Sequence, residues 1–292
     1  MRIVKSLIAL LFLLITLSGC DKELAPNIDG SKTAEKITLL DEEYGKDLLQ
    51  KVDIHLPANR NTQKTKVLIL IHGGAWLQGN KEEMNPLVEA LQPHLGSDYA
   101  IVNMNYRLVN PLVPRYMIPT QPEDVGNVVD YIEKYADVLG VKPQFVMMGF
   151  SAGAHLAMYY SYKHDDKDRV KAVVNIVGPN DLTDATYSNE PLFSLGMRFI
   201  AKSKDIPSGY SAEEYASPIT WVELHPKPTI TFGGETDHLV PVLQHFKLAD
   251  KLSSLHVYNE IYLYESGHMF FEKVDEAFKD VVSKTAKFLK QM

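Results

Sequence analysis

Ser151 stands in the segment Gly149–Gly153 (GFSAG), which has the G-x-S-x-G spacing of a nucleophile elbow. The apolar run Gln144–Met148 before it predicts a buried strand, and Ala154–Met158 after it predicts a helix. At such a corner the serine backbone is strained, and the crowded neighbours two residues away must lack side chains. The N–H of Ala152 would face developing negative charge at the helix N-terminus. The pattern predicts a serine nucleophile; the alternative is a strand–helix connection without chemistry.

Two glycines directly after another apolar run are suited to complement this serine. The run Lys66–Ile71 (KVLILI) predicts a central strand and leads into the sequence HGGAW. Because glycine lets the backbone approach a ligand closely, we expect the N–H groups of Gly73 and Gly74 to form an oxyanion hole with Ala152. The alternative is a tight turn in which His72 only ends the strand.

A carboxylate and an imidazole follow two later predicted strands, Pro228–Phe232 and Glu260–Tyr264. Asp237 and His268 lie just beyond these strands, and with Ser151 they give the chain order Ser, Asp, His of an α/β-hydrolase. Because ligand sites in such sheets lie beyond the carboxyl ends of the strands, we expect the three side chains to converge. His268 would take the proton of Ser151, and Asp237 would fix the imidazole tautomer.

The chain also contains other groups of the types that these roles need. Glu235, two residues before Asp237, is a weaker candidate for the acid. His155 falls inside the helix after the elbow, where we expect it to face neighbouring packing. No HExxH motif and no paired Cys or His spacing is present, so the sequence predicts neither a metal ion nor another cofactor.

The remaining apolar runs alternate between strand and helix patterns. This alternation predicts an α/β fold with a mostly parallel central sheet of about eight strands and helices on both faces. Residues 178–227, with scattered prolines and short helix-like pieces such as Pro191–Ala201, predict a lid-like insertion. Further strands are expected at Leu48–Leu56, Tyr99–Asn105 and Val170–Val177, and helices at Asn85–Gln92 with Asn85 as its cap, Gln121–Leu139 with Gly140 as its stop, Val242–Leu255 and Val274–Leu289.

The N-terminus has the pattern of a secretory signal. Residues 1–19 carry two basic residues before an apolar stretch too short to span a bilayer. The single cysteine of the chain, Cys20, stands where a bacterial lipobox places its lipidated residue, so residues 20–35 would tether the domain 36–292 to a cell-envelope membrane. Removing residues 1–19 changes the net charge from −7 to −9, because only Arg2 and Lys5 are lost. Such an acidic domain is a poor nucleic-acid binder.

Taken together, these motifs make the chain resemble α/β-hydrolase serine esterases of the HGG-containing branch. These are the hormone-sensitive-lipase-like enzymes and, more closely, bacterial carbohydrate acetyl- or feruloyl-esterase-like proteins. The resemblance covers roughly residues 45–290 and includes Asp53 in DIHLP, HGGAW and GFSAGAHLA. Two departures are Ala75, where a third glycine is usual, and Phe150, where an acid usually precedes the nucleophile. The motifs HGGAW and SAGAHLA also resemble those of arylformamidases.

The expected function is therefore a lipid-anchored serine carboxylesterase that acts on small-molecule esters through an acyl-enzyme. Arylformamidase-like amide cleavage and a non-catalytic binding lipoprotein are the alternatives. We expect short acyl groups, because Trp76, Phe150 and Met269 would wall the substrate pocket. Five apolar residues of the insertion have two alternative roles: they line a tunnel for longer acyl chains, or they pack on the sheet edge. They are Leu192, Phe193, Leu195, Met197 and Phe199.

Overall fold

A computed structural model describes residues 25–292 except 111, 114, 190, 192–196 and 270–275. The order of strands and helices along the chain agrees with the sequence prediction. The strands are β1 (Ile37–Glu43), β2 (Lys51–Leu56), β3 (Lys66–Ile71), β4 (Tyr99–Met104), β5 (Phe145–Phe150), β6 (Val170–Ile176), β7 (Thr229–Gly234) and β8 (Asn259–Tyr264).

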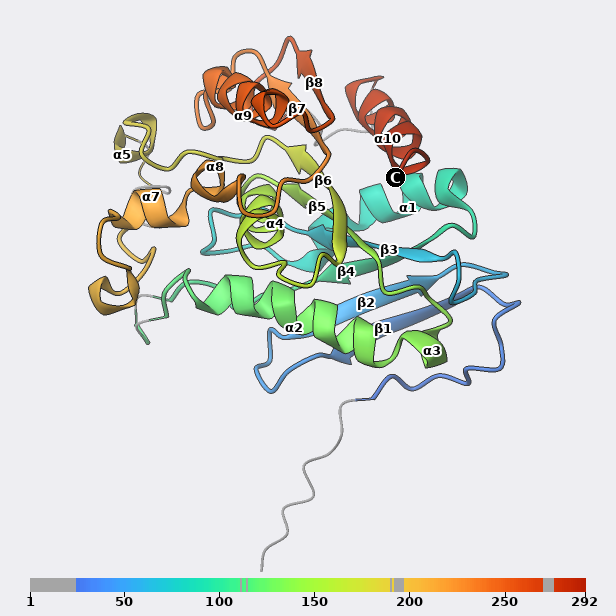
Figure 1. The fold of residues 1–292 in the computed structure, drawn as a ribbon. Helices are drawn as coiled ribbons and strands as arrows, with labels where there is room; N and C mark the ends of the chain where they lie inside the picture. Colours follow the sequence, from blue (N-terminus) through green and yellow to red (C-terminus); the bar gives the residue numbers. More distant parts are fainter. Residues whose placement is uncertain (1–24, 111, 114, 190, 192–196, 270–275) are drawn as a thin grey trace, which may run out of the picture.

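These strands form one eight-stranded sheet in the order β1-β2-β4-β3-β5-β6-β7-β8 (Figure 1). Strands β3 to β8 are mutually parallel, and β2 runs antiparallel to both β1 and β4. The predicted mostly parallel sheet is therefore confirmed. Because β5, β7 and β8 are parallel and near one another, the loops that follow them emerge at the same edge of the sheet.

Helices cover both faces of this sheet. They are α1 (Asn85–Leu95), α2 (Thr120–Lys134), α3 (Ala136–Leu139), α4 (Ala152–Lys163), α5 (Thr186–Asn189), α7 (Ala212–Ala216), α8 (Pro218–Trp221), α9 (Val242–Ser254) and α10 (Glu276–Leu289), with 3-10 turns η1 (Lys81–Met84) and η2 (Ser203–Asp205).

The alternation of side chains along β3 shows how the core is divided. Val67, Ile69 and Ile71 face a cluster built with α2, α4 and α9. Leu68 and Leu70 point to the other face and join a cluster built with α1 and α10. All five side chains are fully buried, so β3 is a central strand, as its unbroken apolar run predicted.

Two predicted helix boundaries need correction. The stretch Gln121–Leu139 is not one helix, because the backbone leaves helical geometry at Tyr135 (φ −106°, ψ 16°) and α3 begins after it. Gly140 does end the segment, in a left-handed conformation at φ 69°. Asn85 is the first residue of α1 rather than its cap, because the 3-10 turn η1 leads directly into the helix and Asn85 already has helical geometry (φ −56°, ψ −38°). Its side-chain oxygen accepts a hydrogen bond from Asn103 Nδ2 (3.1 Å).

In the insertion segment, residues 178–227, the described residues (all but 190 and 192–196) form only short helices, as expected. It is joined to the loop after β4 by backbone hydrogen bonds from Met117 N to Phe199 O and from Ile118 N to Ile200 O, both 2.7 Å. Met197 and Phe199 pack against the core, which supports packing rather than a tunnel for these two side chains. The other three tunnel candidates, and residues 192–196 of the predicted helix 191–201, lie outside the described residues.

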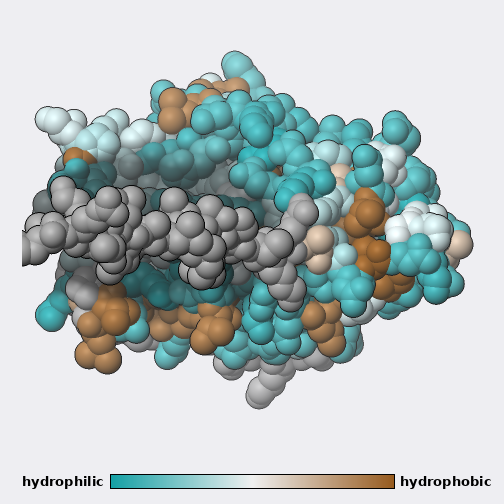
Figure 2. All heavy atoms as spheres, turned by 90° about the horizontal axis from the view of Figure 1, so that it is seen from below, coloured by the Kyte–Doolittle hydropathy of each residue, from teal (hydrophilic) through white to brown (hydrophobic). Residues whose placement is uncertain are grey.

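The predicted signal peptide and Cys20 also lie outside the described residues. Within the part that is described, no helix combines the length and apolar character needed to cross a membrane. The face seen from below is largely hydrophilic, and its apolar side chains gather in several small groups (Figure 2).

Candidate active site

Ser151 occupies a sharp corner between β5 and α4. Its backbone lies at φ 52° and ψ −120°, a region that side-chain-bearing residues rarely adopt, and its side chain is buried. A Cβ on Gly149 would lie 2.3 Å from the backbone of Gly153, and a Cβ on Gly153 would lie 2.1 Å from Ile71 O. Both glycines are therefore required by close backbone approach, which is the crowding that the elbow pattern predicted.

The structure brings Ser151, His268 and Asp237 together in one hydrogen-bonded row. His268 Nε2 lies 2.8 Å from Ser151 Oγ, and His268 Nδ1 lies 2.7 Å from Asp237 Oδ2. The three side chains come from the loops after β5, β8 and β7 and are each at most 9% exposed. With Nδ1–H donating to the carboxylate, Nε2 is left to accept the proton of the serine hydroxyl.

Asp237 is positioned by its own loop. Its Oδ1 accepts hydrogen bonds from the backbone N–H groups of Leu239 (2.8 Å) and Val240 (2.9 Å), which leaves Oδ2 free for His268. The loop is joined to the one that carries His268 by the bond from Thr236 N to Ser266 O (3.1 Å). Glu235, the weaker alternative, is exposed to solvent and takes no part in this row.

The backbone after β3 lies beside the elbow, as the contact of Gly153 with Ile71 shows. The N–H groups of Gly73, Gly74 and Ala152 have no acceptor in the part of the chain that the structure describes. Unpaired backbone donors beside a nucleophile are what an oxyanion hole requires. The Tyr106 hydroxyl lies 3.0 Å from His72 O and 3.2 Å from Gly73 O, so it can donate to either carbonyl of this turn.

The three predicted pocket residues differ in their placement. Phe150 lies beside the row: its ring is 5.6 Å from that of His268, and a Cβ on Gly73 would be 2.8 Å from Phe150 Cδ1. Met269 follows His268 and is 46% exposed. Trp76 is only 1% exposed and lies in the core, where its indole N–H donates to His155. Trp76 therefore offers almost no surface to a ligand, contrary to the prediction.

Sequence reasoning missed two side chains that shape this site, Tyr106 and His155. Tyr106 follows the predicted strand β4 closely, but nothing in the sequence tells which carbonyls its hydroxyl would reach. His155 was interpreted as a packing residue, although it stands one helical turn after Ser151 in GFSAGAHLA. Its exact spacing from the nucleophile was the available signal.

Several buried histidines are held in their neutral form. Burial lowers the pKa of His72, His155 and His245 to about 4 in each case. His245 Nδ1 and Nε2 both lack hydrogen-bond partners among the described residues. All three imidazoles are therefore uncharged in the folded protein at neutral pH.

Acid should destabilise the protein through these histidines. The unfolded chain takes up protons on histidine near pH ~6.5, whereas the folded protein does so only near pH 4. Between these values the unfolded state binds more protons, so the free energy of unfolding falls as pH falls, by about 1.4 kcal/mol per pKa unit for each histidine. Urea unfolding from pH 7 to pH 4.5 measures this, and we expect His245→Leu to flatten the dependence.

The exposed His94 provides the matched control. We expect His94→Gln to leave the pH dependence of unfolding as in the wild type. An equal flattening in both variants, or no loss of stability by pH 4.5, would contradict the assignment of the effect to buried imidazoles.

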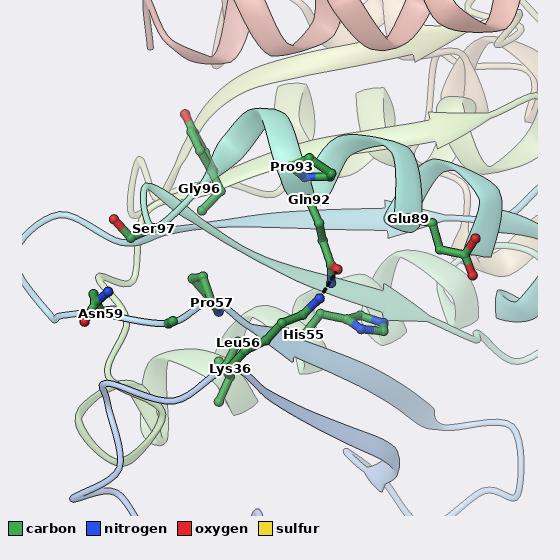
Figure 3. A pocket seen from close by; sticks show the side chains of 12 residues that line it. Lys36, His55, Leu56, Pro57, Asn59, Glu89, Gln92, Pro93, Gly96 and Ser97 are labelled. Carbon is green, nitrogen blue, oxygen red and sulfur yellow. Dashed lines mark hydrogen bonds between the residues drawn. The ribbon is translucent and has the colours of Figure 1, made fainter.

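Other places in the molecule do not contribute to the row. A cavity of about 590 Å³ opens where β2 ends and β4 begins, at the opposite edge of the sheet, and Lys36, His55 and Gln92 are among its lining residues (Figure 3). None of the predicted site residues lines it. Among the described residues, no group of three His, Cys, Asp or Glu side chains is placed to hold a metal ion.

The chain is similar in sequence to several known enzymes. The chain is 30% identical over 229 residues to the probable carboxylic ester hydrolase LipM of Mycobacterium tuberculosis, covering 72% of this chain and 50% of that protein. It is 29% identical over 172 residues to the kynurenine formamidase of Danio rerio, covering 56% of this chain and 55% of that protein. The chain thus spans about half the length of these curated relatives.

The fold is shared with solved structures. One is the truncated form of a carbohydrate esterase from gut microbiota, with a TM-score of 0.68 and 19% identity, covering 89% of this chain and 99% of that one. Residues 52–252 match the BD-FAE family. This stretch includes Gly73, Gly74, Ser151 and Asp237. The chain therefore belongs to the BD-FAE family of α/β-hydrolases.

Proposed function

We propose that the protein is a serine carboxylesterase that works through an acyl-enzyme intermediate. The observation that carries this proposal is the row of Ser151, His268 and Asp237, with distances of 2.8 and 2.7 Å between successive side chains. Membership of the BD-FAE family and the ester hydrolase LipM among the relatives support the same activity.

The reaction follows from the geometry of the row. His268 Nε2 takes the proton of Ser151 as Oγ attacks the ester carbonyl, and Asp237 stabilises the imidazolium that forms. The N–H groups of Gly73, Gly74 and Ala152 bind the oxyanion of the tetrahedral intermediate. When the intermediate collapses, His268 returns the proton to the leaving alcohol. Water then attacks the acyl-enzyme by the same route and regenerates Ser151.

Phe150 favours short acyl groups. Its ring stands beside His268 and against Gly73, where it would limit the space on the acyl side. Because Trp76 is buried, Phe150 rather than Trp76 is the residue that would limit the acyl side of the pocket. A hydrophobic pocket discriminates by only ~1–3 kcal/mol per methylene, so activity should decline gradually with acyl length.

A panel of p-nitrophenyl esters from acetate to decanoate tests the function and the acyl preference together. We expect the highest kcat/KM at acetate to butyrate and a shift to longer chains in Phe150→Ala. A fluorophosphonate probe should label the wild type at Ser151. A wild type that neither hydrolyses esters nor takes up the probe would refute the esterase and leave a non-catalytic binding protein. A maximum at octanoate or longer would refute only the short-acyl preference.

Amide cleavage is a second candidate, favoured by the similarity to kynurenine formamidase. Its reaction uses the same row of side chains but expels an amine, which requires protonation by His268 as the bond breaks. Matched N-formyl and N-acetyl anilides distinguish the two candidates. A kcat/KM on the formyl anilide above that on p-nitrophenyl acetate would favour the formamidase.

Export and anchoring through Cys20 complete the proposal. The support is the sequence pattern: a basic and then apolar N-terminal segment that ends at the only cysteine of the chain. We expect mass spectrometry of the mature protein to find a lipid-modified Cys20 at the N-terminus, and Cys20→Ala to block maturation and membrane retention. An unmodified N-terminus downstream of Cys20 would indicate an ordinary cleaved signal.

A further inference from the structure

His155 connects three segments of the chain that meet around the candidate active site. It lies in α4, one turn after Ser151, and its side chain is 0% exposed. Its Nδ1 lies 3.2 Å from Trp76 Nε1, in the turn after β3. Its Nε2 lies 2.8 Å from Ala216 O, at the end of α7 in the insertion segment. One imidazole therefore joins the nucleophile helix, the oxyanion turn and the insertion.

The partners of His155 fix its tautomer. The indole N–H of Trp76 can only donate a hydrogen bond, so Nδ1 of His155 must accept it. The proton is then on Nε2, which donates to the carbonyl of Ala216. A second proton on Nδ1 would place two donors face to face, and burial lowers the pKa of His155 to about 4. The neutral imidazole therefore satisfies both neighbours at once.

Trp76 fixes the backbone of the oxyanion turn. Gly74, Ala75 and Trp76 have φ values of +105°, +50° and +65°, three consecutive residues in the left-handed region. Such a conformation costs on the order of 1–3 kcal/mol per non-glycine residue and persists only where the surroundings enforce it. Trp76 supplies much of this enforcement, because its carbonyl accepts bonds from Val109 N and Gln121 Nε2, both 2.9 Å. Its side chain is oriented by His155.

The insertion has a second attachment to α4 that does not involve His155. Lys163 Nζ lies 3.3 Å from the ring centre of Tyr215 and 3.9 Å from that of Trp221, and it donates to the hydroxyl of Tyr159 (2.8 Å). These contacts hold α7 and α8 against the helix. Loss of the bond between His155 and Ala216 should therefore leave the insertion in place.

We propose that His155 is a positioning residue for catalysis: by accepting the hydrogen bond of Trp76, it keeps the strained turn 73–76 aligned as an oxyanion hole for the acyl transfer at Ser151. The inference rests on the proposed esterase function. His155 does not touch the substrate in this role. Its effect passes through the indole of Trp76 to the backbone donors of Gly73 and Gly74.

The test is a double-mutant cycle with a rescue variant, measured on p-nitrophenyl acetate. His155→Phe keeps a ring but removes the acceptor, and Trp76→Phe keeps a ring but removes the donor. His155→Asn places an amide oxygen close to the position of Nδ1, so it retains the acceptor for Trp76 while losing the donor to Ala216. Titration of active sites with a fluorophosphonate gives kcat per functional serine, which corrects for any unfolded protein.

We expect His155→Phe and Trp76→Phe each to lower kcat about ten- to hundred-fold with little change in KM, because misplaced donors act on the transition state alone. The double variant should be no slower than the slower single variant, since both remove the same bond. His155→Asn should recover most of the loss. The matched control is Tyr162→Phe, which breaks a buried bond of the same helix to Thr229 Oγ1 (2.7 Å) and should leave kcat unchanged.

Wild-type kcat in Trp76→Phe, additive losses in the double variant, or an equal loss in Tyr162→Phe would each overturn the proposal. If His155→Phe does not fold, the comparison of Trp76→Phe with Tyr162→Phe still decides it. An inactive wild type without fluorophosphonate labelling would refute the esterase itself. An active wild type with unaffected variants would refute only the role of His155.

Discussion

Ser151→Ala is expected to abolish ester hydrolysis and fluorophosphonate labelling while leaving the fold intact. The variant removes the attacking oxygen, and in serine hydrolases of this type the loss in kcat is on the order of 10⁶-fold. What remains would come from the oxyanion hole and binding, roughly 10³–10⁴ above the rate in water. The fold should persist because the hydroxyl of Ser151 bonds only to His268 among the described residues, and alanine occupies the same backbone position.

Ser161→Ala is the matched control for this prediction. Ser161 lies on the same helix, is buried, and bonds through Oγ to Ala157 O (2.7 Å), away from the row. We expect wild-type kcat and wild-type labelling from this variant. Circular dichroism and thermal unfolding of both variants establish that they fold. A folded Ser151→Ala protein with near-wild-type turnover would refute Ser151 as the nucleophile.

Asp237→Asn is expected to lower kcat by about 10⁴-fold through the wrong histidine tautomer. The structure shows how the amide of Asn at position 237 would be oriented. The N–H groups of Leu239 and Val240 both point at Oδ1, so the amide oxygen of asparagine would take that position. The amide NH₂ would then donate to His268 Nδ1, and the imidazole proton would move to Nε2. In that tautomer Nε2 cannot accept the proton of Ser151.

Glu235→Gln separates the two carboxylates that the sequence offered for this role. Glu235 is exposed to solvent and lies two residues before Asp237 in the chain, outside the hydrogen-bonded row. The variant should therefore retain wild-type kcat on p-nitrophenyl acetate. A larger loss in Glu235→Gln than in Asp237→Asn would show that the acid has been assigned to the wrong residue. Thermal unfolding of both proteins checks that any loss in kcat is not a loss of folded protein.

The fold could be predicted largely from local patterns. Unbroken apolar runs such as Lys66–Ile71 mark strands buried on both faces, and the structure places that strand within the predicted bounds. Boundaries were less predictable where a side chain found a distant partner. Asn85 is not a cap because the 3-10 turn Lys81–Met84 leads directly into α1, and its side-chain oxygen accepts a hydrogen bond from Asn103 on β4 instead. The break at Tyr135 likewise has no signal in the periodicity of the residues around it.

For the candidate site, the sequence by itself determined the chemistry and its chain order. The spacing of GFSAG requires the elbow, and Asp237 and His268 each follow a strand of the same parallel sheet, so their convergence depends on topology alone. These are local or fold-level constraints. The glycine at position 153 follows from the same elbow geometry, because a Cβ there would lie 2.1 Å from Ile71 O.

Only the tertiary structure decided which side chains support that chemistry. His155 reaches partners 79 and 61 residues away in the chain, and Tyr106 reaches carbonyls 34 and 33 residues away. Trp76 likewise looked like a pocket wall from its position after HGGA, yet it is buried as a hydrogen-bond donor. A hydrogen bond depends on distances within a few tenths of an ångström, and sequence patterns specify the placement of a strand or helix far more coarsely than that.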